Sequence, residues 1–304
     1  MNIGSEAPPM AKKKTKHYPV VKGSPISSGT SANTLVDMAR NLSVLNRRLY
    51  RFGRNYNVKV DVRHDYAGTP IEVFALRDDW AVQKAFQMAY QQYLNNTQEE
   101  RENMTSKQVA RWEDFRIRDG FTLAKNDARP VMHTPAGVAT VLTAGEFALS
   151  NVVDDAGTTF TFSWGAGSPS NYGILEEYDK TDNTQLSSSS ITADGAYSGI
   201  DSLNDEATSD NLKNDGNAPP YDAGGVNAPN PWVRVAVLGG TAGTQKLSSG
   251  FFTAPCGLVL LKGFSEESAA YSVEVEAKAG DYKGVHAPSM IEVATVNRKR
   301  KVVK

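Results

Sequence analysis

Apolar residues recur along this chain in two periods, and the changes of period mark its segments. From Thr34 they follow one another at spacings of three and four residues, which places them on one face of a helix. These positions are Leu35, Met38, Leu42, Leu45, Leu49 and Phe52. Thr34 and Asp37 have the spacing of a capping box at the start of such a helix. The pattern therefore predicts an amphipathic helix over 34–54.

The period shortens to two after this helix and then lengthens again. Alternating valines predict a strand through residues 58–62, and a second strand is predicted over 71–76. Helical spacing then returns, with Asp78 suited to cap one helix and Thr105 to begin another. The two helices are predicted to form an insertion over 78–119.

From residue 131 onward the pattern is typical of strands separated by turn residues. The candidate strands are 137–142, 146–153, 158–164, 172–178, 232–238, 251–253 running on to 257–262, 271–277 and 290–297. The segment 180–230 is rich in Ser, Asn, Asp, Gly and Pro and cannot cover a core, so long exposed loops are predicted there. The chain is thus predicted to be mainly β, an antiparallel sandwich or barrel with a two-helix insertion.

Charge is strongly segregated, although the net charge of the whole chain is only −1. Residues 1–64 contain twelve Lys and Arg against three acids, whereas residues 145–230 contain fourteen acids against two lysines. The C-terminal segment 298–304 is basic again. Because condensed counterions are released when cations meet phosphates, this distribution predicts that both ends of the chain contact a polyanion.

The charge pattern and the apolar pattern together divide the chain into a flexible basic arm over 1–33, the basic helix over 34–54, a β domain over 55–297 and a basic tail over 298–304. Arginine suits phosphate because its planar fork matches the phosphate oxygens. The candidate nucleic-acid contacts are Lys12, Lys13, Lys14, Lys16, Arg40, Arg47, Arg48, Arg51, Arg54, Arg298, Lys299, Arg300 and Lys301. A helix that packs in the core with a solvated basic side fits the same pattern, and so does a helix on a membrane surface.

Motifs of known reactive chemistry are missing from the sequence, including nucleotide-binding loops and hydrolase or metalloprotease signatures. The histidines are scattered without ligand-like spacing; they are His17, His64, His133 and His286. Cys256 lies among apolar residues, as a buried structural thiol does. We therefore expect no enzyme activity, cofactor, metal or small-molecule substrate. With no signal peptide or membrane span recognised, a reducing, soluble compartment is expected.

The order of basic arm, basic helix, two strands, helical insertion, further strands, acidic loops and basic tail resembles the capsid proteins of small icosahedral, tailless viruses with jelly-roll subunits. The resemblance implies a jelly roll over 55–297, and a double jelly roll is the alternative. It also implies self-assembly into a shell in the host cytoplasm or nucleus, a place in the virion, and non-sequence-specific contact of the basic termini with the genome. In the double form, an internal membrane would be a further partner.

Two other classes of function fit parts of the pattern. A nucleic-acid-binding β-barrel module would also carry a basic arm. In such a module, however, one face of the sheet is expected to have aromatic residues interleaved with cations. A carbohydrate-binding or carbohydrate-processing β-sandwich would use the polar loops and an acid pair. Such a protein has no use for two basic termini.

Overall fold

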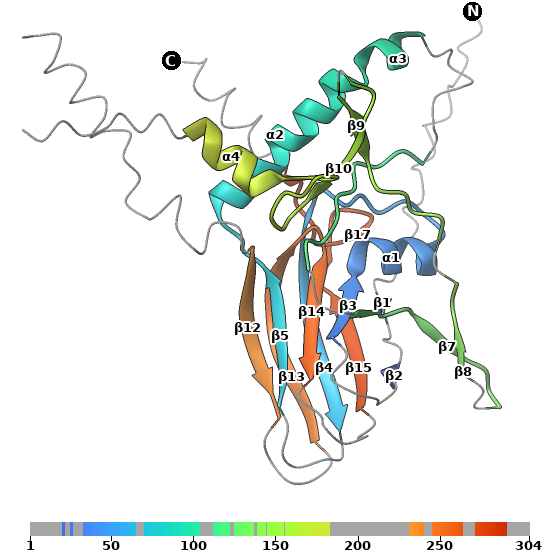
Figure 1. Ribbon diagram of the computed structural model, residues 1–304. Helices are drawn as coiled ribbons and strands as arrows, with labels where there is room; N and C mark the ends of the chain where they lie inside the picture. The colour runs from blue at the N-terminus through green and yellow to red at the C-terminus, as the bar shows by residue number, and fades with distance from the viewer. Residues whose placement is uncertain are drawn as a thin grey trace, which may run out of the picture.

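The computed structural model has more residues in strands than in helices, and most strand pairs are antiparallel (Figure 1), so the predicted mainly β class is confirmed. Two five-stranded sheets carry the fold. The structure describes residues 20–21, 25–26, 33–64, 70–103, 112–121, 125–136, 139–143, 145–154, 156–182, 231–239, 245–263 and 271–290.

The first sheet is antiparallel throughout and has β4 at its centre, between β15 and β13. The short strands β1 and β2 lie along the other edge of β15. The strands of this sheet are β1 (Val20–Val21), β2 (Pro25–Ile26), β15 (Tyr271–Ala277), β4 (Asn55–His64) and β13 (Gln245–Pro255).

The second sheet has the order β12-β5-β14-β3-β6, with parallel pairing between β3 and β6 and antiparallel pairing elsewhere. Its strands are β12 (Trp232–Leu238), β5 (Ile71–Leu76), β14 (Leu258–Gly263), β3 (Asn33–Asp37) and β6 (Lys125–Asp127). Successive strands therefore cross between the sheets, with β4 in the first, β5 in the second, β13 in the first and β14 in the second.

Aliphatic side chains from both sheets form the first core between them. In β4 the alternation predicted from the sequence is confirmed, because Val58, Val60 and Val62 are fully buried. They pack with β5 and β14, whose contributions include Val73 and Val259. Each such side chain contributes about 1.5–3 kcal/mol through removal of its apolar surface from water.

A second, aromatic core lies at one end of the sandwich, beneath helices α2 and α4 in Figure 1. Phe86 of α2 stacks on Trp164 at 6.0 Å between ring centroids and meets Phe115 edge-on at 5.3 Å. The elements of this layer are α2 (Trp80–Asn96), α3 (Gln98–Asn103), β9 (Asn151–Val153), β10 (Thr159–Ser163), β11 (Asn171–Gly173) and α4 (Ile174–Asp182). Two separate strand pairs are β7 (Val131–His133) with β8 (Ala139–Val141), and β16 (Ala279–Gly280) with β17 (Gly284–Val285).

The helix predicted over 34–54 is much shorter, because α1 spans only Met38–Asn46. Residues 34–37 belong to β3, whose backbone is hydrogen-bonded between β14 and β6, and Asp37 rather than Thr34 caps the helix. Arg47 adopts the left-handed conformation (φ 50°) and ends it. The apolar stripe is buried as predicted but divided between cores: Met38 and Leu42 lie in the first, whereas Leu35 and Phe52 lie in the second. Residues 34–37 form a strand in spite of their helical spacing, because the neighbouring strands provide backbone hydrogen-bond partners.

The helical insertion is also shorter than 78–119. Its first helix is confirmed as α2, with Asp79 rather than Asp78 as the cap. Of the second, residues 104–111 lie outside the described part, and 112–117 are not helical. Phe115 is buried as expected of a core residue, but Trp112 is 64% exposed.

Three of the predicted strands need correction. The strand predicted over 146–153 is confirmed only as β9, because residues 146–150 are not in a strand. Residues 174–178 begin α4 instead of continuing the strand 172–178. The segment 251–262 is two strands that do not pair with each other: β13 and β14 lie in different sheets and are joined by a turn at Cys256 and Gly257, both with positive φ. Cys256 is fully buried beside Met290, as expected, and burial raises the pKa of its thiol well above the ordinary value.

The predicted arm over 1–33 contains β1 and β2, which use the open edge of β15. The lysines at 12–16, the loops at 183–230 and the tail at 298–304 lie outside the described residues.

Candidate nucleic-acid interface

The segment between α1 and β4 brings several of the predicted contacts together. Arg47 and Arg48 are exposed, and the backbone N–H of each donates to the carbonyl of Ser43 at the end of α1. The side chain of Arg51 is 58% exposed. Because these three arginines follow a helix end whose backbone is hydrogen-bonded, they are presented to solvent from an ordered turn.

The turn between β16 and β17 adds tyrosine and lysine to this segment. The hydroxyl of Tyr282 accepts the backbone N–H of Arg51 at 3.1 Å, and the guanidinium of Arg54 lies 3.5 Å above the Tyr282 ring. Lys283 donates to the carbonyl of Leu49. We call Arg47, Arg48, Arg51, Arg54 and Lys283 the basic surface.

Aromatic packing holds the two segments of the basic surface in place. Tyr50 is buried, meets Tyr282 edge-on at 6.0 Å, and donates its hydroxyl to the carbonyl of Lys283 at 3.0 Å. Burial raises the pKa of Tyr50. Arg54 also donates to the carbonyl of Ala287 at 2.7 Å, so its guanidinium is fixed against the β16–β17 segment.

Arg40 is not part of the basic surface. Its guanidinium binds the carboxylate of Asp127 at 3.0 Å, and its side chain is only 16% exposed. Its assignment as a nucleic-acid contact stays a prediction, as do those of Lys12–Lys16 and Arg298–Lys301, which lie outside the described residues.

A buried charge cluster of Asp37, Arg116 and Asp114 lies behind the basic surface. Arg116 donates to Asp37, and its other terminal nitrogen is 3.7 Å from Asp114. The side chains of all three are exposed by 8% or less. Asp37 also caps α1 by accepting the backbone N–H of Arg40 at 2.8 Å. The cluster thus joins the start of α1 to the segment 114–116.

Asp114 connects this cluster to the basic surface. Its carboxylate accepts the backbone N–H of Phe52 at 2.9 Å and lies 4.0 Å from a terminal nitrogen of Arg51. Burial raises the pKa of Asp114 to about 6, against the opposing effects of the Phe52 N–H and of Arg116. The carboxyl therefore gains and loses its proton near neutral pH.

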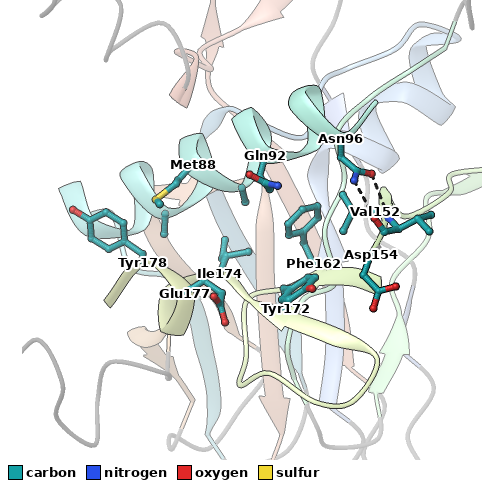
Figure 2. Close-up of a pocket in the computed structure, with 13 residues that line it drawn as sticks. Met88, Gln92, Asn96, Val152, Asp154, Phe162, Tyr172, Ile174, Glu177 and Tyr178 are labelled. Atoms are coloured by element: carbon teal, nitrogen blue, oxygen red, sulfur yellow. Dashed lines mark hydrogen bonds between the residues drawn. The ribbon is translucent and has the colours of Figure 1, made fainter. Parts of the chain in front are cut away.

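A cavity of about 450 Å³ lies elsewhere, between α2, α4 and strands β9–β11 (Figure 2). Its walls are mainly apolar, and its thirteen lining residues, all in the described part, include no lysine, arginine or histidine. The amide of Asn96 binds both backbone groups of Val153 there. Figure 2 shows the carboxylates of Asp154 and Glu177 directed away from α2. Carboxylates that act on a glycosidic bond flank it, so the carbohydrate alternative draws no support from this cavity.

The residues that the structure describes contain no group of three or more His, Cys, Asp or Glu that could hold a metal ion. In the same residues, no helix is long and apolar enough to cross a membrane.

Sequence reasoning missed Lys283 and Asp114. Lys283 is far along the chain from the arginines and carries no local motif; its positive φ of 51° marks the turn only in the structure. Asp114 was assigned to a helix, where it would have been one more surface acid. Only the tertiary contact with Phe52 identifies it.

The chain matches no protein-family model, and comparison with curated proteins and with solved structures likewise gives no match.

Proposed function

We propose that this chain is the major capsid protein of a small icosahedral, tailless virus, with a jelly-roll subunit that self-assembles into a shell. It assembles in the host cell, becomes part of the virion, and contacts the packaged genome without sequence specificity. The observation that carries the proposal is the segregation of charge: a basic surface ordered on a β-sandwich, in a chain whose two ends are also basic.

The arrangement of the strands supports this proposal. Double-sheet jelly rolls pass the chain repeatedly from one sheet to the other, and here β4 and β5, then β13, β14 and β15, lie in alternate sheets. The parallel β3–β6 pair is an addition to that scheme. A rigid sandwich gives self-complementary sides, from which symmetry builds closed assemblies.

The exposure of the basic surface supports contact with a polyphosphate. Genome packaging requires affinity for phosphate without base recognition, which cations supply through counterion release. Arg47, Arg48 and Arg51 provide guanidinium groups on the outside of the folded part. Acidic segments elsewhere in the chain, such as 145–230, would limit unspecific binding to other surfaces.

Particle size tests the proposal. Gel filtration and negative-stain microscopy of the purified full chain, with and without nucleic acid, are expected to give shells or ring-shaped oligomers. A monomer that persists across salt and protein concentrations contradicts the capsid function. If that monomer still binds nucleic acid, the nucleic-acid-binding module is the better description.

Neutralising the exposed arginines is expected to weaken nucleic-acid binding and its salt dependence. Each phosphate contact contributes about 0.7–0.9 to the slope of log K against log salt concentration. For the double variant Arg47→Gln and Arg48→Gln, the slope should fall by up to about 1.8 units. Fluorescence anisotropy with a labelled oligonucleotide at several salt concentrations measures this change.

Lys84→Gln is the matched control, since Lys84 is an exposed lysine on α2, which is not part of the basic surface. Its salt dependence should equal that of the unmodified chain. An unchanged slope in the double arginine variant would show that the basic surface does not contact phosphate.

A further inference from the structure

Asp114 occupies a position from which its charge acts directly on the basic surface. Its carboxylate accepts the Phe52 N–H in the arginine-bearing segment and lies 4.0 Å from Arg51. The neighbouring Glu113 is turned away, because its carboxylate binds Arg101, 3.1 Å away, and Tyr93. Arg51 does approach the Glu113 carbonyl, at 3.3 Å. Asp114 is thus the carboxylate that faces Arg51.

Other ionisable groups surround Asp114. On its inner side are Arg116 and Asp37, which bind each other. Tyr56 and Cys256 also act on the cluster electrostatically, and burial raises the pKa of each well above its ordinary value, so both stay protonated. Asp114, whose pKa burial raises to about 6, differs from these two in changing its charge near neutral pH.

We propose that Asp114 is a positioning residue for the basic surface, and that its protonation strengthens binding of a polyanion such as nucleic acid to that surface. The inference rests on the proposed function, because it concerns the regulation of the same site. The proposal is about the affinity of the basic surface for a polyanion. Because coupling between two binding events is reciprocal, a bound polyanion in turn favours the protonated form of Asp114.

Protonation of Asp114 acts on the basic surface through two physical effects, and both strengthen the binding of a polyanion. In the ionised form, the Asp114 carboxylate attracts the Arg51 guanidinium and repels an approaching phosphate. When a proton from solvent neutralises it, the carboxyl oxygen still accepts the Phe52 N–H, but the attraction to Arg51 ends. The turn keeps its hydrogen bond and the basic surface gains one unit of positive charge. With the screening of bulk water at 4 Å, the expected change in affinity is about five-fold.

The test measures binding of a labelled single-stranded oligothymidylate to the full chain at constant ionic strength. Between about pH 7.5 and about pH 5, the unmodified chain should gain about five-fold in affinity beyond any change that Asp114→Asn shows. Asparagine has nearly the same shape and cannot ionise, so at about pH 7.5 Asp114→Asn should bind about five-fold more tightly than the unmodified chain, and the two should bind about equally at low pH. Histidines are common to both proteins and cancel in the comparison.

Asp281→Asn is the matched control, since Asp281 is an exposed carboxylate beside Tyr282. It should keep the pH dependence of the unmodified chain. The proposal is overturned if Asp114→Asn retains the same pH dependence as the unmodified protein.

An NMR titration separates this inference from the proposed function. The Phe52 amide and the Arg51 side-chain signals should shift together with the Asp114 carboxyl carbon. If no oligonucleotide binds at any pH, the proposed function fails, while a joint titration still supports the coupling. If the Phe52 and Arg51 signals do not follow Asp114, the coupling is wrong even where binding is observed.

Discussion

Replacing Arg116 by methionine is expected to lower the free energy of unfolding at neutral pH by about 3–5 kcal/mol. Arg116 is 6% exposed and is the cation between the carboxylates of Asp37 and Asp114. Its loss leaves these two carboxylates buried near each other, with the exposed Arg51, 4.0 Å from Asp114, in place of the buried cation. Methionine fills a similar volume, so the loss reflects charge rather than a cavity. Urea denaturation followed by tryptophan fluorescence measures it.

Arg118→Met provides the comparison, two positions further along the same segment. Arg118 is exposed, and only its backbone is used in pairing with Phe162 and Trp164. Its replacement should change the free energy of unfolding by less than about 0.5 kcal/mol. If Arg116→Met and Arg118→Met lower the free energy of unfolding equally, removal of the cation from the buried charge cluster has no large effect of its own.

The stability contribution of Asp114 is expected to fall as pH rises, by about 2–3 kcal/mol between about pH 4 and about pH 7.5. Its pKa in the folded chain, about 6, lies above the ordinary value of 3.8. The folded state therefore binds this proton more tightly than the unfolded state. The stabilisation is complete below the unfolded value and is lost as pH rises through the folded value.

The difference in free energy of unfolding between Asp114→Asn and the unmodified chain isolates this effect, because all other carboxylates titrate in both. Asp114→Asn should be similar in stability at about pH 4 and more stable by about 2–3 kcal/mol at about pH 7.5. A difference that does not change with pH would mean that Asp114 has an ordinary pKa in the folded chain.

Strands with strict alternation were predicted well from the sequence. The valines of β4 and the strands β5 and β15 lie where the pattern placed them. The bounds of β12 also agree, but its alternating valines are exposed, because the pairing with β5 shifts between Arg234 and Ala236. Alternation is a local property that survives in any sheet with one buried face. The first helix of the insertion was likewise found, since α2 buries one continuous face formed by Val82, Phe86 and Ala89.

Segments shared between two structural units were predicted poorly. The stripe from Leu35 to Phe52 fits a helical period, but its members belong to β3, α1 and a turn, and to two different cores. The apolar run through Cys256 has the pattern of one strand, but it turns there and passes from one sheet to the other. In both segments, the residue types predict that the side chains are buried. The path of the backbone, whether helix, strand or turn, depends on hydrogen-bond partners that are far away in the sequence.

The candidate site shows the same division. Arg47, Arg48 and Arg51 were expected from their charge, and their exposure agrees with that expectation. Arg40 was grouped with them by sequence distance, yet it lies in an ion pair with Asp127. Lys283 joined the site only through the packing of Tyr282 against the arginine segment.

The sequence by itself determined the mainly β class, the buried valine face of β4 and the segregation of charge, because each depends on residue type and on spacing along a single element. The tertiary structure alone decided which strands share a sheet, where the first helix begins and ends, and which acid lies behind the arginines. Those features depend on contacts between distant residues, and the ionisation of Asp114 depends on a burial that residues from several segments create together.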